Sequence, residues 1–139
     1  MLRQLSHSLA IRAACPGLHE FTPDVARWVQ SSGIHEGLLT VFCRHTSASL
    51  VIQENAAPAA RRDLETYFAR LAPESGDYEH DDEGPDDMPA HLRSALTQTQ
   101  LTIPVANGRM ALGTWQGIYL FEHRRGTPER RIALHLIGE

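Results

Sequence analysis

Acidic side chains and histidines gather in one stretch of the sequence. Between Glu74 and Asp87, eight of the fourteen residues are Asp or Glu and none is Arg, and His80 and His91 lie within and just beyond this acidic segment. Carboxylates packed this closely repel one another, so a positive partner usually offsets them. Carboxylate oxygens suit a hard cation such as Mg²⁺, whereas imidazole suits zinc or another transition metal. The acidic segment therefore indicates either a divalent metal site or a solvated loop.

A histidine followed by hydroxyl residues is the second candidate. His45, Thr46 and Ser47 come directly after an apolar run that predicts a strand, and loops at the ends of strands often carry functional side chains. A serine hydrolase of the familiar type would need a Gly-x-Ser-x-Gly elbow, which this segment lacks. The segment is interpreted either as part of a ligand site or as a polar turn.

Three further segments each allow a functional and a structural interpretation. Glu54 and Asn55 either reach the same cleft as His45 or serve the start of the next helix, because Asn is a favoured helix cap. The glycines of residues 113–117 permit close backbone approach, or they mark a bulge around a core tryptophan. The arginines near the last turn form a phosphate clamp or a solvated turn; they are Arg124, Arg125, Arg130 and Arg131.

The elements that would position these residues mix strands and helices. Alternation and apolar runs predict strands over 4–13, 38–43, 48–53, 101–105, 110–112, 115–122 and 131–137, and helices that begin at Thr22, near Pro58 and at Pro89. The run 38–43 is nearly continuous in apolar residues and is interpreted as a strand buried on both faces. Hairpins dominate, so the predicted fold class is α+β with a largely antiparallel sheet and about three helices.

Composition limits the function classes. The 139 residues suit one domain over residues 1–139, and the net charge of −4 resides in the acidic segment, because the rest of the chain carries 13 arginines against nine acids. There is no lysine and no basic run, which argues against a nucleic-acid partner. No stretch predicts a signal peptide or a membrane span, so we expect a cytoplasmic protein with no membrane partner.

Seven short motifs, in order along essentially the whole chain, resemble those of the YjbQ-like family, which is also described as the secondary thiamine-phosphate synthase family. They are residues 45–50, 54–55, 78–81, 83–84, 86–91, 113–118 and 122–124. One departure is visible: the family usually has Asp-Pro after Glu-Asn-Ala, and this chain has Ala57-Pro58. A carboxylate at this position, either as a helix cap or as part of the site, is therefore not expected to be needed in this chain.

The resemblance implies a YjbQ-like α+β sandwich that assembles as a homotrimer. It also implies a divalent metal, Zn²⁺ or Mg²⁺, held by His45, His80 and His91. Asp86 or Asp87 would act as a further ligand or would hold the histidines.

The activity that the resemblance implies is a transfer reaction, as a main or a secondary activity. A pyrimidine pyrophosphate joins a thiazole phosphate, giving thiamine phosphate and releasing pyrophosphate. The metal would neutralise the departing charge, and an arginine would bind phosphate on the small phosphorylated substrate. The candidate catalytic residues are Thr46, Ser47, Glu54, Asn55, Asp86, Asp87 and Arg124.

Three alternatives stay open at this point. One is a non-catalytic trimeric module that binds a metal or a small anionic ligand. Another is a metal-dependent phosphate-ester hydrolase. The third is a trimeric structural partner whose acidic segment docks on a basic surface.

Overall fold

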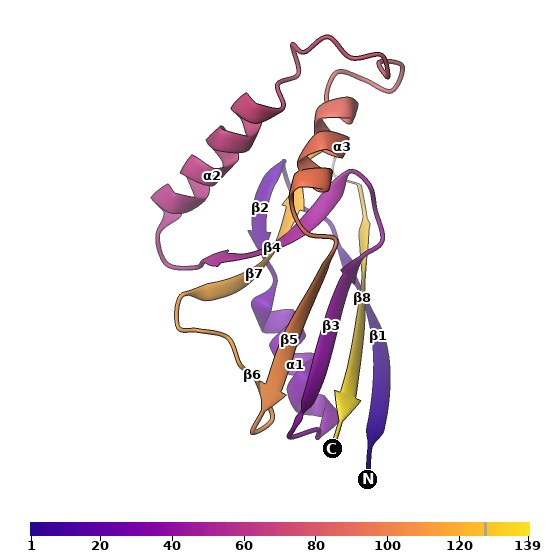
Figure 1. Ribbon diagram of the computed structural model, residues 1–139, viewed down its shortest axis with the longest axis vertical. Coiled ribbons are helices and arrows are strands. Elements are labelled where there is room, and N and C mark those ends of the chain that lie inside the picture. The colour runs from indigo at the N-terminus through magenta and orange to yellow at the C-terminus, as the bar shows by residue number, and fades with distance from the viewer. Residues whose placement is uncertain (127) are drawn as a thin grey trace.

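Two antiparallel sheets form the body of the protein in the computed structural model, which describes residues 1–126 and 128–139. The larger sheet has the order β1 (Arg3–Ile11), β8 (Arg130–Gly138), β3 (Gly37–Cys43), β5 (Gln100–Ala106) and β6 (Arg109–Met110). The smaller sheet has the order β2 (Gly17–Glu20), β7 (Gln116–Glu122) and β4 (Ala48–Glu54). Every pairing between these strands is antiparallel. Figure 1 shows how the strands are arranged.

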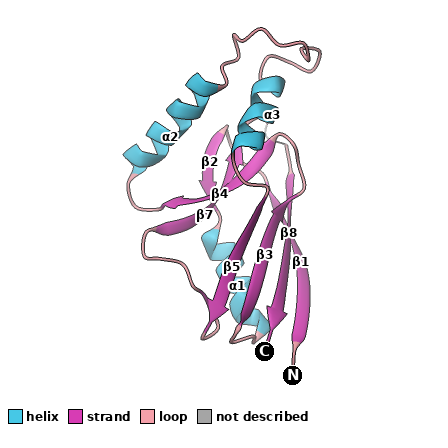
Figure 2. Ribbon diagram, in the orientation of Figure 1, coloured by secondary structure: helices cyan, strands magenta, loops and turns pink. Residues whose placement is uncertain are grey.

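Three helices accompany the sheets in the described part of the chain: α1 (Thr22–Ser32), α2 (Pro58–Leu71) and α3 (Asp87–Leu96). Helix α1 has Pro23 in its first turn and ends at Gly33, whose φ of 72° is a left-handed conformation that glycine adopts without strain. In Figure 2, α2 and α3 lie at one end of the molecule, joined by a long loop, while α1 lies behind the larger sheet. This arrangement confirms the predicted α+β class with three helices.

The core lies between the sheets and α1. Strand β5 alternates as its sequence predicts, with Leu101, Ile103 and Val105 buried and the residues between them exposed. Strand β3 differs from its prediction, because Leu39 and Val41 are buried but Leu38 and Phe42 are 45% and 41% exposed. Within one chain the strand is therefore buried on one face only, which differs from the interpretation of it as buried on both faces. An apolar run cannot by itself show whether another layer covers the second face.

Several element boundaries differ from the sequence-based expectations, and one of them concerns the acidic segment. Helix α3 begins at Asp87 and not at Pro89, so the acidic segment ends inside the first helical turn. Strand β2 was not predicted, because its four residues show no clear alternation. Trp115 precedes β7 and is exposed, which excludes the alternative that made it a core residue. None of the helices in residues 1–126 and 128–139 is long and apolar enough to cross a membrane.

Candidate metal centre

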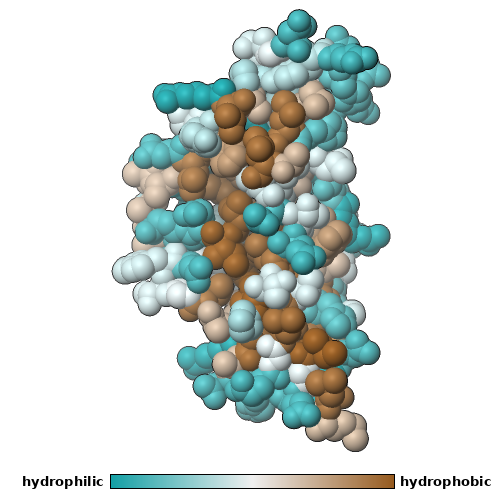
Figure 3. All heavy atoms as spheres, viewed as in Figure 1, coloured by the Kyte–Doolittle hydropathy of each residue, from teal (hydrophilic) through white to brown (hydrophobic). Residues whose placement is uncertain are grey.

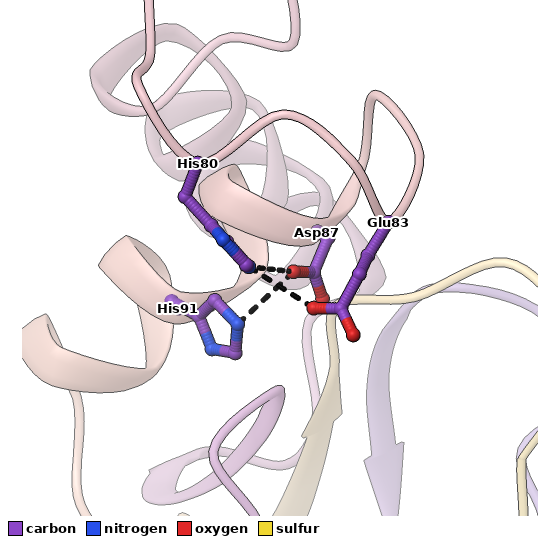
Figure 4. Close-up of side chains that lie close together, drawn as sticks. All are labelled: His80, Glu83, Asp87 and His91. Carbon is purple, nitrogen blue, oxygen red and sulfur yellow. Dashed lines mark hydrogen bonds and ion pairs between the residues drawn. The ribbon is translucent and has the colours of Figure 1, made fainter.

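Four side chains that carry metal-binding atoms converge where the acidic segment meets α3. Each of His80, Glu83, Asp87 and His91 offers one nitrogen or oxygen atom, and these atoms all lie within 4.8 Å of one another. His80 and Glu83 come from the loop, whereas Asp87 and His91 stand one turn apart on α3. Figure 4 shows the two rings and the two carboxylates pointing toward one another. We call these four residues the His–carboxylate cluster.

The ring of His91 is oriented by the loop that follows β3. Its Nδ1 lies 2.9 Å from the carbonyl oxygen of Thr46, and a carbonyl can only accept, so Nδ1 carries the hydrogen. In the neutral ring Nε2 then has a lone pair, and this atom lies 3.1 Å from Oδ2 of Asp87. Two acceptors at this distance need a proton or a metal ion between them. A metal-binding histidine commonly donates its other ring N–H to a carbonyl in this way.

Arginines on the segment after β7 hold the two aspartates. Arg124 pairs with Oδ1 of Asp87, which leaves Oδ2 facing the histidines. Oδ2 of Asp86 accepts a hydrogen bond of 2.9 Å from the backbone amide of Arg125 and lies 3.2 Å from Nε of Arg124. Burial alone would raise the pKa of Asp86, but these partners hold it below its ordinary value. Asp86 therefore stays ionised without facing the cluster.

The ionisation of Asp87 and His80 is linked. Burial tends to raise the pKa of Asp87, but His91, His80 and Arg124 together lower it below its ordinary value. Nε2 of His80 lies 2.9 Å from Oδ2 of Asp87 and 3.0 Å from Oε2 of Glu83, and these hydrogen bonds raise the pKa of His80. Without a metal ion, the cluster thus favours a protonated imidazole beside a carboxylate.

The spacing of the cluster also suits a metal ion. Ligand atoms about 2.1 Å from one ion lie about 3.0 to 3.4 Å apart in octahedral or tetrahedral geometry. Oδ2 of Asp87 is 2.9 Å from Nε2 of His80 and 3.1 Å from Nε2 of His91, so small shifts would place all three on one ion. Two imidazoles with two carboxylates favour zinc or a similar transition metal over Mg²⁺, which prefers an all-oxygen set.

A concavity lies directly beside the cluster. Its volume is about 720 Å³, and its lining includes His80, Tyr78 and Met88 with the carboxylates of the acidic segment. Of the cluster, His80 lines this concavity, and the side chains of His80 and Glu83 are 45% and 60% exposed, so solvent reaches these two members. A small molecule could therefore approach an ion held by the cluster.

Of the predicted metal ligands, His45 does not join the cluster. Its Nε2 accepts a hydrogen bond of 2.8 Å from the backbone amide of Arg131 on β8. Burial, with the charge of Arg130, lowers the pKa of His45, so this ring stays neutral as an acceptor. The structure brings His80 and His91 together with two carboxylates, and His45 lies outside this group. His45 fixes the loop after β3 against β8.

The backbones of Thr46 and Ser47, and not their hydroxyl groups, make the contacts near the site. The carbonyl of Thr46 orients His91, and the carbonyl of Ser47 accepts a hydrogen bond of 3.1 Å from Arg130. No hydrogen bond from either hydroxyl group occurs among the described residues. Their role in orienting a substrate stays a prediction.

Glu54 and Asn55 have structural contacts away from the cluster. The carboxylate of Glu54 accepts hydrogen bonds from the backbone amides of Ala56 and Ala57, which are free at the start of α2. The side-chain amide of Asn55 lies 3.4 Å from each of the carbonyl oxygens of Thr114 and Gln116. These contacts favour the structural interpretation of both residues, although neither caps α2, because its N-cap residue is Ala57 and Glu54 holds the turn that precedes the helix.

The arginines expected to bind phosphate are engaged with carboxylates. Arg124 contacts Asp86 and Asp87, and Arg125 pairs with Glu74 of the acidic segment. Each guanidinium thus compensates part of the negative charge of that segment. Whether a small phosphorylated molecule binds this protein remains a prediction.

Glu83 is the residue of the cluster that the sequence interpretation missed as a ligand. Glu83 lies in a loop without regular structure, so no repeating sequence pattern shows which way its side chain points. The path of the loop turns its carboxylate toward His80. Asp87 and His91 did carry a signal. Residues four apart on a helix share one face, so a helix that starts at Asp87 places both side chains on one side.

Comparison of the sequence with protein families gives a match to the family described as UPF0047 protein YjbQ-like, over residues 7–139. The chain is 52% identical over 138 residues to a UPF0047 protein of Synechocystis sp., covering 99% of this chain and 94% of the relative. It is 44% identical over 133 residues to the UPF0047 protein YjbQ of Escherichia coli O157:H7, covering 95% of this chain and 96% of that one.

Solved structures show the same fold. A YbjQ-like protein of unknown function from Sulfolobus solfataricus superimposes with a TM-score of 0.92 at 26% identity and covers all of both chains. An uncharacterized conserved protein of the YjbQ/UPF0047 family from Clostridium acetobutylicum superimposes with a TM-score of 0.82 at 32% identity, covering 95% of this chain and 98% of that one.

These descriptions correct the predicted activity. The relatives are described as UPF0047 proteins and the Sulfolobus structure as one of unknown function, and none of the four descriptions names a thiamine-phosphate synthase. The expected thiamine-phosphate-synthase-type function is therefore contradicted.

Proposed function

The chain belongs to the family of YjbQ-like UPF0047 proteins, and on that premise we propose that it binds a divalent transition-metal ion through the His–carboxylate cluster. The observation that carries this proposal is the pair of imidazole Nε2 atoms, on His80 and His91, that converge on Oδ2 of Asp87. The Nδ1–H of His91 donates to the Thr46 carbonyl, and Oδ1 of Asp87 pairs with Arg124. Each side chain is thus fixed by one atom, and its second atom faces the cluster as a ligand.

Calorimetric titration of the chelator-treated protein with Zn²⁺, Co²⁺ or Mg²⁺ tests the proposal. We expect one Zn²⁺ or Co²⁺ ion per chain and much weaker binding of Mg²⁺. The variants His80→Ala and His91→Ala remove one ligand each and should weaken Zn²⁺ binding by at least about 100-fold. Both side chains are partly exposed, so these variants should fold.

Two histidine variants serve as controls. His135→Ala removes a ring that bonds Gln4 on the larger sheet, and His45→Ala removes the ligand that the sequence had suggested. His135→Ala should bind Zn²⁺ as the unchanged protein does. His45→Ala should weaken binding much less than His91→Ala does, because His45 acts only through the loop whose Thr46 carbonyl orients His91. Absence of Zn²⁺ binding in the unchanged protein, or loss of binding in His45→Ala equal to that in His91→Ala, would overturn the assignment.

An ion at the cluster would remain open to small molecules. Glu83 and His80 are the exposed members, whereas Asp87 is buried, so an ion would be exposed to solvent on the side of these two residues, and His80 also lines the concavity of about 720 Å³. Open positions distinguish catalytic ions from structural ones, so an enzymatic role requires that the ion bind a further ligand beside the four protein atoms, or that the exposed Glu83 give up its place. Inorganic phosphate added to the Co²⁺ protein should shift the visible absorption of the ion if such a position exists. An unchanged spectrum at saturating phosphate would count against a small phosphorylated ligand.

We also propose that the protein self-associates through the uncovered face of the larger sheet, in the trimer that the family resemblance implies. Leu38 and Phe42 lie on this face of β3, and the strand register places Ile137 and Pro104 beside Leu38. Figure 3 shows hydrophobic residues running down the middle of the side of the molecule opposite α1. Exposed apolar surface of this kind often marks an interface.

A further inference from the structure

Two buried residues in the motifs that resemble the family, Ser49 and His123, take no part in the His–carboxylate cluster. Ser49 lies on β4 and His123 directly after β7, and they are 1% and 2% exposed. Oγ of Ser49 lies 2.9 Å from Nε2 of His123. Oγ1 of Thr97, the C-cap of α3, lies 2.5 Å from the same Ser49 oxygen. A chain of hydrogen bonds thus runs from the smaller sheet to the end of α3.

The residues in this series of hydrogen bonds are uncharged. Burial lowers the pKa of His123 to about 3, with help from the charges of Arg93 and Arg130. The imidazole is therefore uncharged at neutral pH. Because a hydroxyl both donates and accepts, Ser49 can join His123 and Thr97 in either proton order. The imidazole of this link accordingly stays uncharged as the pH falls from neutral until it nears the pKa of about 3.

The location of the link matters because α3 carries two members of the cluster. Three contacts hold this helix. Arg124 pairs with Asp87 in the first turn, and the ring of His91 bonds the Thr46 carbonyl near the middle. At the end of the helix, the hydroxyl of Thr97 bonds the hydroxyl of Ser49. The other two members, His80 and Glu83, come from the loop before α3. A ten-residue helix is about 15 Å long and moves as a rod, so loss of one end contact tilts the ligands at the other.

Stability alone does not account for a histidine at position 123. Its Nδ1 is buried with no hydrogen-bond partner among the described residues, which costs about 1 to 3 kcal/mol relative to a paired or exposed nitrogen. An apolar ring would pack beside Phe121 without that cost. What the imidazole adds, and an apolar ring lacks, is a polar atom at Nε2 that holds Ser49.

We propose that Ser49 and His123 are positioning residues for metal binding. Through Thr97 they fix the end of α3, and so set where Asp87 and His91 meet the ligands from the loop. This inference rests on the proposed metal-binding function and adds that the affinity and geometry of the ion depend on a buried hydrogen bond outside the cluster.

A pair of amide variants separates positioning from packing. Gln at position 123 can place its amide nitrogen where His123 has Nε2 and can still bond Ser49, whereas the shorter Asn reaches only toward the Nδ1 position. Both variants bury one amide in the same cavity. We therefore expect similar thermal midpoints for His123→Gln and His123→Asn in the metal-free protein, and a difference in metal binding.

Titration with Co²⁺ gives the readout, because its visible absorption reports ligand geometry. His123→Gln should bind Co²⁺ within about 3-fold of the unchanged protein, whereas His123→Asn and Ser49→Ala should bind about 10- to 100-fold more weakly with an altered spectrum. Equal affinity and spectrum in all four proteins, or equal loss in both amide variants, would overturn the positioning role while metal binding stands. Failure of the unchanged protein to bind Co²⁺ would instead reject the metal-binding proposal itself. Ser49→Ala removes only one oxygen and covers the case in which an amide variant does not fold.

Discussion

Nδ1 of His91 lies 2.9 Å from the carbonyl oxygen of Thr46, a residue 45 positions earlier in the chain. This hydrogen bond lets the loop after β3 determine which ring nitrogen of an α3 side chain faces the acidic segment. The carbonyl accepts, so the neutral imidazole presents a lone pair to the carboxylate of Asp87. The site therefore has to hold a proton or a metal ion, and the two compete.

The first prediction concerns the proton on His80. Hydrogen bonds to Asp87 and then Glu83 raise the pKa of His80, so Asp87→Asn should lower that pKa toward the ordinary value of about 6.5. Because the folded pKa is the higher one, this proton stabilises the metal-free fold fully below about pH 6.5, and the stabilisation is lost as pH rises through the folded pKa. NMR titration of the His80 ring in the metal-free protein measures the shift.

The matched control for this prediction is Glu36→Gln, at a carboxylate whose contact is the backbone amide of Asn107, on the far side of the fold from the cluster. It should leave the pKa of His80 unchanged. The same proton opposes metal binding, so Zn²⁺ affinity should rise with pH and level off above that pKa. A titration curve for His80 that is identical in Asp87→Asn and the unchanged protein would show that the hydrogen bond does not form in solution.

The second prediction concerns acid sensitivity from His123. Its folded pKa of about 3 lies below the unfolded value of about 6.5, so protonation favours the unfolded chain and stability falls as pH drops through this range. Between pH 6 and pH 5 this one group should remove about 1 kcal/mol from the free energy of unfolding. Urea unfolding at both pH values, compared with His123→Gln, isolates the contribution. A variant with the same loss as the unchanged protein would contradict the buried neutral imidazole.

Much of the fold could be predicted from local patterns. Alternation in β5 placed Leu101, Ile103 and Val105 in the core, and Pro23 with Gly33 marked the two ends of α1. These signals work because each depends on near neighbours in the chain. The exposed face of β3 was not predictable in this way, because whether Leu38 and Phe42 are covered depends on which other elements pack there.

The candidate site shows the same division. His80, Asp87 and His91 were singled out by residue type and by the family resemblance, and the structure brings them together. His45 looked equivalent in the sequence, but the pairing of distant strands places the amide of Arg131 against its Nε2. Arg124 likewise looked free to bind phosphate until the fold brought the end of β7 to the start of α3. Contacts between distant segments decided both cases.

The third prediction concerns a buried ion pair that supports the loop after β3. Arg130 and Glu122 are joined by hydrogen bonds of 2.7 and 2.5 Å, with side chains 5% and 0% exposed, and Arg130 also reaches the carbonyl of Ser47. Glu122→Gln leaves the guanidinium buried without its counter-charge and should cost about 3 kcal/mol or more of unfolding free energy. Urea unfolding measures this cost.

The exposed pair between Arg131 and Glu129 gives the matched control. Its side chains are half in solvent, so Arg131→Gln should cost less than about 1 kcal/mol. Replacing both buried partners, in Glu122→Leu with Arg130→Met, should recover part of the stability that Glu122→Gln loses, because no unpaired charge remains. Equal costs for the buried and the exposed pair would contradict the burial seen here.

The last prediction concerns self-association through the larger sheet. Leu38→Glu with Phe42→Glu places two charges on the uncovered face of β3, where desolvating them in an interface would be costly. Light scattering after gel filtration should show the unchanged protein as a trimer and this variant as a monomer. Leu71→Glu, at an equally exposed leucine on α2, should remain trimeric. If the unchanged protein is a monomer, the proposed interface does not exist. If Leu71→Glu is a monomer while the β3 variant is a trimer, the interface lies on α2 and not on β3.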